Sequence, residues 1–178
     1  REVLEGRQHK LLKYPDADIS VFVEVQHRAP ELVIVGGGHI ALPLARLASL
    51  CDFAVTVLDD RPGFVTEERF PTALQRIAAP LRETVRDLPI DRDTYMVLVT
   101  RGHSHDVECL LEVLDRPVGY IGMIGSQRRV QAVFQLLTEE MGIPGEKLDR
   151  VYAPSGLDIG ARTPAESAVC TIAENINA

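Results

Sequence analysis

The chain is poor in cysteine, has fewer basic than acidic residues, and contains no long apolar run. Its 178 residues carry a net charge of −7, which argues against nucleic-acid binding because phosphate backbones are bound by clustered Lys and Arg. No apolar run approaches the roughly 18 residues that span a bilayer, and no signal-peptide pattern opens the chain. The cysteines Cys51, Cys109 and Cys170 are far apart, and each falls in an expected helix. This pattern predicts reduced core thiols in a cytoplasmic protein without disulfides.

A glycine-rich turn follows the first strongly apolar stretch. Residues 32–35 predict a buried strand, and apolar residues recur at near-helical spacing over residues 44–51. Between them, Gly36, Gly38 and Ala41 match the dinucleotide-type fingerprint G-x-G-x-x-G/A. Gly36 can adopt the torsions of a tight turn, and Gly38 allows an anionic ligand to approach the main chain.

An acidic residue ends the next expected strand, residues 54–59. Asp59 lies 23 residues after Gly36, close to the roughly 20 expected for a carboxylate that binds a nucleotide ribose. Together the two features predict a Rossmann-like domain and leave two interpretations of the turn. It binds a nucleotide, or it only packs a helix on a sheet.

The rest of the chain alternates strands and helices. Further strands are expected at 76–79, 95–99, 118–121 and 150–153, with a short helix within 80–93. A helix ending at Gly142 and a last helix capped by Thr163, Pro164 and Glu166 are also expected. This order predicts an α/β fold with a doubly wound, mostly parallel sheet over residues 30–178.

Residues 1–29 are expected to form a separate β appendage. Residues 10–14 and 19–25 predict two strands around a Pro15-Asp16 turn, with Ile19, Val21, Val23 and Val25 on one covered face. A free hairpin is marginal in water, so this one should pack on the main domain, on an upstream domain of which it is the tail, or on a partner chain.

Four loops of unusual composition follow expected strands. The carboxyl ends of parallel strands share one edge, where such sheets bind ligands, so these loops should lie together. If the strand order is 3-2-1-4-5-6, the first two loops flank one crevice. The loops are residues 36–39, 100–106, 122–129 and 154–162.

The second loop holds two imidazoles and a carboxylate, His103, His105 and Asp106. With His39 opposite, both a metal site and a general acid–base site are compatible with these residues, but no third ligand has an established spacing, so the metal stays unassigned. Asp106 also suits a helix cap, and Cys109 suits a buried structural position better than a reactive one.

The third loop has the residue types of an anion-binding pocket. Gly125 and Ser126 precede a helix start that carries Arg128 and Arg129. A solvated helix start is the alternative, although arginine is unfavourable there against the helix dipole, which favours ligand binding. In the last loop, Asp158 lies among glycines and is open to a ligand contact.

With these motifs assembled, residues 20–178 resemble the Rossmann domain of the XdhC-type family, the xanthine dehydrogenase accessory proteins. Three departures from the family pattern are Gln127, Ser155 and Arg162, and the last two weaken expectations for the final loop. The matching stretches are Gly-Gly-Gly-His-Ile-Ala (36–41), Val-Thr-Val-Leu-Asp-Asp-Arg-Pro (55–62), Arg-Phe-Pro (69–71), Val-Thr-Arg-Gly-His-Ser-His-Asp (99–106), Tyr-Ile-Gly-Met-Ile-Gly-Ser (120–126) and Gly-Leu-Asp-Ile-Gly-Ala (156–161).

The resemblance implies a homodimeric maturation factor that binds molybdenum cofactor and helps deliver it to a molybdenum hydroxylase apoenzyme. Such a protein is a cofactor-binding chaperone more than a catalyst. Molybdopterin, like a dinucleotide, presents phosphate beside a flat heterocycle, so the loop residues suit it. The cofactor-binding residues expected are Gly36, Gly37, Gly38, His39, Asp59, Arg101, His103, His105, Gly125, Ser126, Arg128, Arg129 and Asp158.

Two other functions stay open at this stage. Asp59 taken as a ribose-binding acid favours an NAD(P)-dependent oxidoreductase, and Arg61 leaves NADP open. That interpretation lacks a recognisable substrate domain and catalytic pair. The other alternative is a non-catalytic partner protein whose nucleotide fold is empty.

Overall fold

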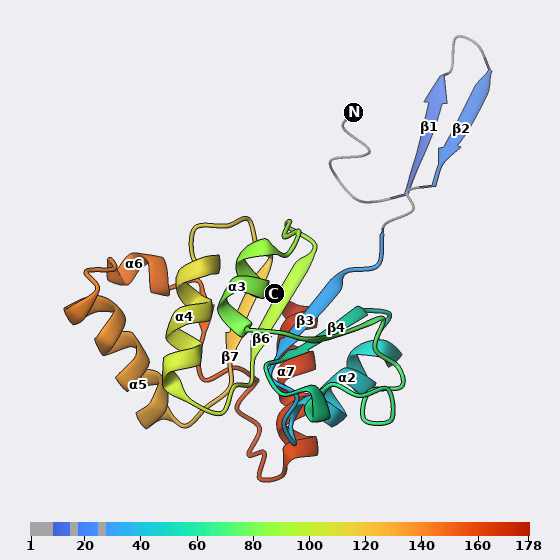
Figure 1. Ribbon diagram of the computed structural model, residues 1–178. Coiled ribbons are helices and arrows are strands. Elements are labelled where there is room, and N and C mark those ends of the chain that lie inside the picture. The colour runs from blue at the N-terminus through green and yellow to red at the C-terminus, as the bar shows by residue number, and fades with distance from the viewer. Residues whose placement is uncertain (1–8, 15–17, 25–27) are drawn as a thin grey trace.

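The computed structural model describes residues 9–14, 18–24 and 28–178 and contains a six-stranded parallel sheet (Figure 1). The strand order is β5-β4-β3-β6-β7-β8, which is the 3-2-1-4-5-6 order of a Rossmann-like domain and confirms the predicted fold. The strands are β3 (Glu31–Val35), β4 (Ala54–Asp59), β5 (Gln75–Ala78), β6 (Thr94–Leu98), β7 (Tyr120–Met123) and β8 (Val151–Tyr152).

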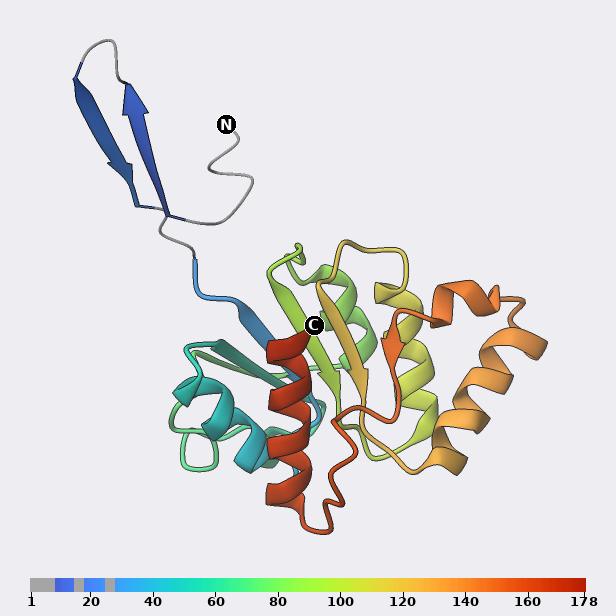
Figure 2. The same ribbon diagram turned by 180° about the vertical axis from the view of Figure 1, so that it is seen from behind.

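Helices cover both faces of the sheet, so its central strands are apolar on both sides. Helices α2 (Ala41–Leu50) and α7 (Pro164–Asn177) pack together on one face (Figure 2). Helices α3 (Leu81–Asp87), α4 (His103–Val113) and α5 (Gln127–Gln135) cover the other. Neighbouring residues of β3 accordingly enter different cores, Ile34 on the α2 side and Val35 on the α4 side.

Short elements complete the domain. A 3-10 turn (η2, Pro62–Phe64) follows β4, a π-helical turn (η3, Leu136–Glu140) extends α5, and a short helix (α6, Gly145–Leu148) precedes β8. Gly142, with φ of +67°, lies just beyond η3, as expected for a residue that terminates a helix. Thr163 and Glu166 form the expected capping box at the start of α7.

Two local predictions were wrong. Strand β7 begins at Tyr120 and not at 118, because the Val118 amide is used in a turn with the Arg116 carbonyl, 2.8 Å away. Cys51 follows the last residue of α2 and is exposed, whereas Cys109 and Cys170 are buried. Within the described parts of the chain, no helix combines the length and apolar character needed to cross a membrane.

The N-terminal strands β1 (Lys10–Tyr14) and β2 (Ile19–Val23) form an antiparallel hairpin that stands apart from the sheet (Figure 1). The side chains of Ile19 and Val21 are 52% and 41% exposed. The main domain therefore does not cover the face that the alternation predicted to be covered. The predicted Pro15-Asp16 turn and Val25 lie outside the described residues.

Candidate functional site

The three glycines of the turn after β3 have different surroundings. Gly36 has φ of +112°, and a Cβ atom there would lie 2.4 Å from the Val99 carbonyl oxygen. A Cβ atom at Gly37 would lie 2.3 Å from the Phe64 carbonyl oxygen, whereas no atom of the described residues lies within 4 Å of the corresponding position at Gly38. The first two glycines are therefore required by packing, and the third faces open space.

Asp59, at the end of β4, is 2% exposed and accepts four hydrogen bonds from within the chain. The Gly37 amide donates to Oδ2 at 2.8 Å. Arg61 donates through its backbone amide and Nε to Oδ1, at 2.9 and 2.8 Å, and through Nη2 to Oδ2 at 2.9 Å. Burial opposes ionisation, but the hydrogen bonds from Arg61 and Gly37 outweigh it and lower the pKa of Asp59 to about 2.

The chain after β4 folds back over the glycine turn. The Arg61 guanidinium carbon lies 3.5 Å from the centroid of the Phe64 ring, a cation–π contact. Arg69 donates through Nη2 to the Gly37 carbonyl oxygen at 2.9 Å. A carboxylate offers about four acceptor positions, so the acid expected to bind ribose has all of them occupied by Arg61 and Gly37. We call Gly36, Gly37, Asp59, Arg61 and Phe64 the closed cluster.

A cavity of about 440 Å³ lies where α4 and α5 begin, at the carboxyl edge of β6 and β7. Five of the residues expected to bind cofactor line it. Both helices direct the positive ends of their dipoles toward this edge, which favours an anion. We call it the cationic pocket, and its lining residues are Arg101, Gly102, His103, Ser126, Arg128, Arg129 and Ala132.

Arg129 is held by a buried carboxylate from the neighbouring helix. It donates through Nε to Asp106 Oδ2 at 2.9 Å and through Nη2 to the Thr100 carbonyl oxygen at 3.0 Å. Thr100 donates to the other oxygen of Asp106 at 2.6 Å. Burial raises the pKa of Asp106, while the hydrogen bonds from Thr100 and Arg129 oppose that shift. The network ties the two loops of the pocket together.

This network corrects the expectation that Asp106 caps a helix. The N-cap position of α4 is Gly102, and the Asp106 carboxylate accepts from side chains of Thr100 and Arg129. The pairing also gives Arg129 a structural reason for lying in the first turn of α5. Ser126 does cap α5, because its hydroxyl oxygen accepts from the Arg129 amide at 3.3 Å.

The other basic side chains of the pocket are available to a ligand to different degrees. Arg128 and His103 have exposed side chains and neither hydrogen-bond nor ion-pair partners among residues 9–14, 18–24 and 28–178. Arg101 pairs with Asp60, Nη2 to Oδ2, at 2.7 Å. The pocket therefore offers a guanidinium and an imidazole that the described residues leave unpaired, both beside helix starts.

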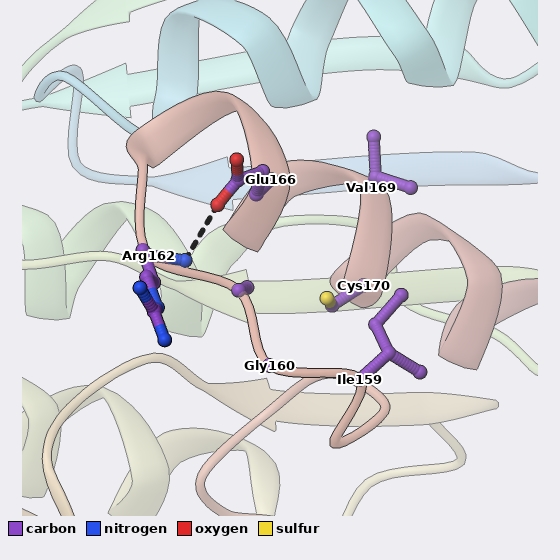
Figure 3. A pocket seen from close by; sticks show the side chains of 7 residues that line it. Ile159, Gly160, Arg162, Glu166, Val169 and Cys170 are labelled. Atoms are coloured by element: carbon purple, nitrogen blue, oxygen red, sulfur yellow. Dashed lines mark hydrogen bonds between the residues drawn. The ribbon is translucent and has the colours of Figure 1, made fainter.

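A second cavity, of about 360 Å³, lies under the loop after β8. Gly125, Gln127 and Asp158 line it, while the intervening Ser126 lines the cationic pocket, so the two cavities adjoin along this loop. A third cavity, of about 330 Å³, shares Gly160, Ala161 and Cys170 with the second. Figure 3 shows this third cavity, with Ile159, Val169 and Cys170 on one side and Arg162 and Glu166 on the other.

The loop after β8 is anchored by a tyrosine hydroxyl. Tyr120 donates to Glu174 Oε2 at 2.5 Å, and its oxygen lies 2.7 Å from the Ser155 hydroxyl. The Gly156 amide donates to the same Glu174 oxygen at 2.8 Å. Burial and the hydrogen bond to Glu174 raise the pKa of Tyr120, so its hydroxyl stays a donor. Ser155, a departure from the family pattern, therefore has a structural role.

The histidines are not brought together. His105 lies in a different cavity, lined also by Asp60 and Glu108, and its Nδ1 is 3.8 Å from a Glu108 oxygen. His39 is exposed and lines none of the four cavities. Among the described residues, no group of three or more His, Cys, Asp and Glu side chains could hold a metal ion. Burial, then the Asp106 charge, raises the pKa of Cys109 to about 12, which keeps it a neutral thiol.

Sequence reasoning missed the contacts that organise both regions. Thr100 and Asp60 follow the carboxyl ends of β6 and β4. Their place after these strands was the sequence feature that could have indicated a role at this edge of the sheet. The contact between Arg69 and the Gly37 carbonyl joins residues 32 positions apart, and no spacing rule indicates it.

Comparison with known proteins identifies the family. Residues 32–175 match the XdhC Rossmann domain. The chain is 32% identical over 157 residues to the uncharacterized protein YqeB of Escherichia coli and 31% identical over 165 residues to a probable xanthine dehydrogenase subunit of Bacillus subtilis. These alignments cover 88% and 93% of this chain but only 28% and 48% of the relatives, so the chain spans less than half of their length.

A solved structure agrees with this match. The crystal structure of a xanthine dehydrogenase from Bacillus halodurans has a TM-score of 0.72 to this chain at 29% identity. The similarity covers 84% of this chain and 42% of the other. The fold, the matched residues and the relatives agree: this chain belongs to the XdhC family and carries its Rossmann domain.

Proposed function

We propose that the chain is part of an accessory factor for molybdenum hydroxylases of the xanthine dehydrogenase type, which binds molybdenum cofactor and assists its delivery to the apoenzyme. Family membership and a relative named as a probable xanthine dehydrogenase subunit support the accessory role. The chain spans under half of these relatives, so delivery is proposed for the whole protein and cofactor binding for this domain.

The cationic pocket is the observation that carries the proposal. Molybdopterin ends in a phosphate. Arg128 and His103, which have no partner in the described part of the chain, lie beside the starts of α4 and α5. An arginine fork and free helix amides are the groups that bind phosphate most effectively. We assign the phosphate of the cofactor to this pocket, with Arg128 as its principal ligand.

The flat heterocycle of the cofactor is assigned to the adjoining cavity under the loop after β8. Gly125 and Ser126 are consecutive residues that line the two cavities, so one extended ligand can contact both. Asp158 and Gln127 supply hydrogen-bonding groups for a pterin edge. When bound, the cofactor brings the molybdenum that the client hydroxylase uses, and this chain binds and orients it.

An NAD(P)-dependent oxidoreductase is supported less well. It requires Asp59 to bind ribose, and the four hydrogen bonds from Arg61 and Gly37 occupy that carboxylate. Phe64 packs against Gly37 where a Cβ atom would already clash. A nucleotide would have to break these contacts before it gained any.

Isothermal titration with molybdopterin, NAD(H) and NADP(H) tests the proposal directly. We expect molybdopterin to bind wild type, and Arg128→Ala to weaken binding about tenfold or more because a charge-assisted hydrogen bond is lost. Gly38→Asp tests the glycine turn separately, because Gly38 lines neither of the two assigned cavities. It adds a negative charge without a clash, since no described residue has an atom within 4 Å of its Cβ position. Arg46→Ala, an exposed arginine of α2 that lines none of the four cavities, is the matched control.

The outcomes separate the candidate functions. Unchanged cofactor retention in Arg128→Ala contradicts the assignment of the phosphate to the cationic pocket, and a loss confined to Gly38→Asp places the phosphate at the glycine turn instead. Binding of NAD(H) with hydride turnover favours the oxidoreductase. Absence of measurable binding to all three ligands favours a non-catalytic partner protein. A homodimer in the cytoplasm is part of the same proposal, and light scattering measures the association state.

A further inference from the structure

Arg101 belongs to two structures at once. It lines the cationic pocket, and its Nη2 also donates to Asp60 Oδ2 at 2.7 Å. Asp60 follows β4 and Arg101 follows β6, so the ion pair reaches across the loop after β3, which lies between them in the sheet. The described residues give Arg101 no other ion-pair or hydrogen-bond partner.

We propose that Asp60 is an internal competitor for Arg101 and thereby sets the affinity of the cationic pocket for phosphate-bearing ligands. The inference rests on the proposed function of that pocket. It assigns a role in binding to Asp60, which does not line the pocket. An anion that enters the pocket draws Arg101 away from Asp60, and the measured affinity is reduced by the free energy of the pair.

The surroundings of Asp60 allow this exchange. Its carboxylate also lies 3.8 Å from Arg61 Nε, so a cation remains beside it when Arg101 leaves. The Arg101 side chain is 50% exposed and free to reorient, whereas the preceding Thr100 is fixed by Asp106 and Arg129. The anchor of Arg101 is therefore rigid and its guanidinium can turn.

The size of the effect follows from the exposure of the pair. Ion pairs of this kind contribute little, which corresponds to about a two- to fivefold change in affinity. Asp60→Asn should therefore tighten anion binding about two- to fivefold at low salt, and the gain should shrink as salt screens the pair. Arg101→Ala should weaken binding and make the residue at position 60 irrelevant.

Isothermal titration of the 178-residue chain with inorganic pyrophosphate tests the proposal, with thermal unfolding as a check on folding. The variants are Asp60→Asn, Asp60→Glu, Arg101→Ala and the double variant that combines Asp60→Asn with Arg101→Ala. Asp60→Glu keeps the carboxylate and should restore affinity close to that of wild type. Asp87→Asn is the matched control, because Asp87 forms a similar exposed pair with Arg86 and lines none of the four cavities.

Tighter binding in Asp60→Asn, no change in Asp87→Asn and no gain in the Arg101→Ala background support the competition. Equal or weaker binding in Asp60→Asn overturns it, as does a gain that persists without Arg101. If wild type binds pyrophosphate, Arg128→Ala loses that binding and Asp60→Asn binds with wild-type affinity, only the competition fails. If no variant binds pyrophosphate, the competition and the phosphate pocket both fail.

Discussion

The closed cluster and the cationic pocket lie at the same edge of one sheet, and they differ in whether their polar side chains are paired within the chain. In the closed cluster, Asp59 receives four hydrogen bonds and is 2% exposed. In the cationic pocket, Arg128 and His103 have no partner within the described ranges. A polar group that is already satisfied gains little from a ligand, whereas an unpaired charge beside a helix start gains a hydrogen bond.

The difference shows that the glycine-rich sequence motif and the free ligand-binding groups belong to different loops. The glycine turn carries the sequence signature of nucleotide binding, yet its first two glycines are explained by contacts with Val99 and Phe64. The cationic pocket carries a weaker signature and the better supply of ligand-binding groups. A motif that specifies a fold and a cavity rich in ligand-binding groups can thus lie at one edge of the same sheet.

The largest effect should come from adding a methyl group inside the closed cluster. Gly36→Ala places a Cβ 2.4 Å from the Val99 carbonyl at φ of +112° and should cost about 2–5 kcal/mol of unfolding free energy. Gly38→Ala meets open space and should change stability by less than about 0.5 kcal/mol. Urea unfolding measures both, and equal losses would erase the distinction between the two glycines.

The next effect concerns the carboxylate of the closed cluster. Its pKa is lowered from 3.8 to about 2, so its contribution is complete above about pH 4 and is lost as pH falls toward 2. Asp59→Asn should lose about 2 kcal/mol at pH 7, and the gap to wild type should narrow between pH 4 and 2. Unfolding at several pH values measures this, and a gap independent of pH would contradict the paired state of Asp59.

Ligand addition should act on the cationic pocket alone. Pyrophosphate at ten times its Kd should raise the unfolding free energy by about 1.4 kcal/mol. At the same pyrophosphate concentration, the increase should fall to about 0.4 kcal/mol or less in Arg128→Ala, because binding is expected to be tenfold or more weaker. It should also fall in high salt, since the contacts are electrostatic. Differential scanning fluorimetry follows the change, and stabilisation by NAD(H) of equal size would move the binding site to the closed cluster.

The smallest effect is a gain in stability on removing a ligand-binding group. Arg128 is the second residue of α5 and lies against the positive end of the helix dipole. Without ligand, Arg128→Ala should therefore stabilise the chain by about 0.3–0.5 kcal/mol while it weakens anion binding. A loss of stability in careful denaturant titrations would assign Arg128 a structural role.

Most of the fold could be predicted because periodicity and turns are local signals. The buried strand at 31–35, the positive-φ glycine after it and the capping box of α7 follow from neighbouring residues. The start of β7 was misplaced by two residues because Val118 is as apolar as the strand it precedes, and only its turn hydrogen bond excludes it.

The site could be predicted only as a set of loops. Parallel topology brings the loops to one edge, so Arg101, Ser126 and Arg128 were found together. Which charges pair with one another depends on side-chain direction across loops, as for Asp106 and Arg129, which are 23 residues apart. Composition gives no measure of that direction, so the hydrogen bonds that Arg129 and Asp59 form within their own chain could not be predicted. Ligand binding by these two residues stays a prediction.

The distribution of thiols makes the chain convenient for site-specific chemistry. All three cysteines are described, and Cys51 alone is exposed, at the end of α2 opposite the helix starts of the pocket. Cys109 is a neutral buried thiol, and Cys170 is 4% exposed. A maleimide fluorophore or a nitroxide should therefore attach to the native sequence at one position, away from the cationic pocket, and report on conformation without any cysteine substitution.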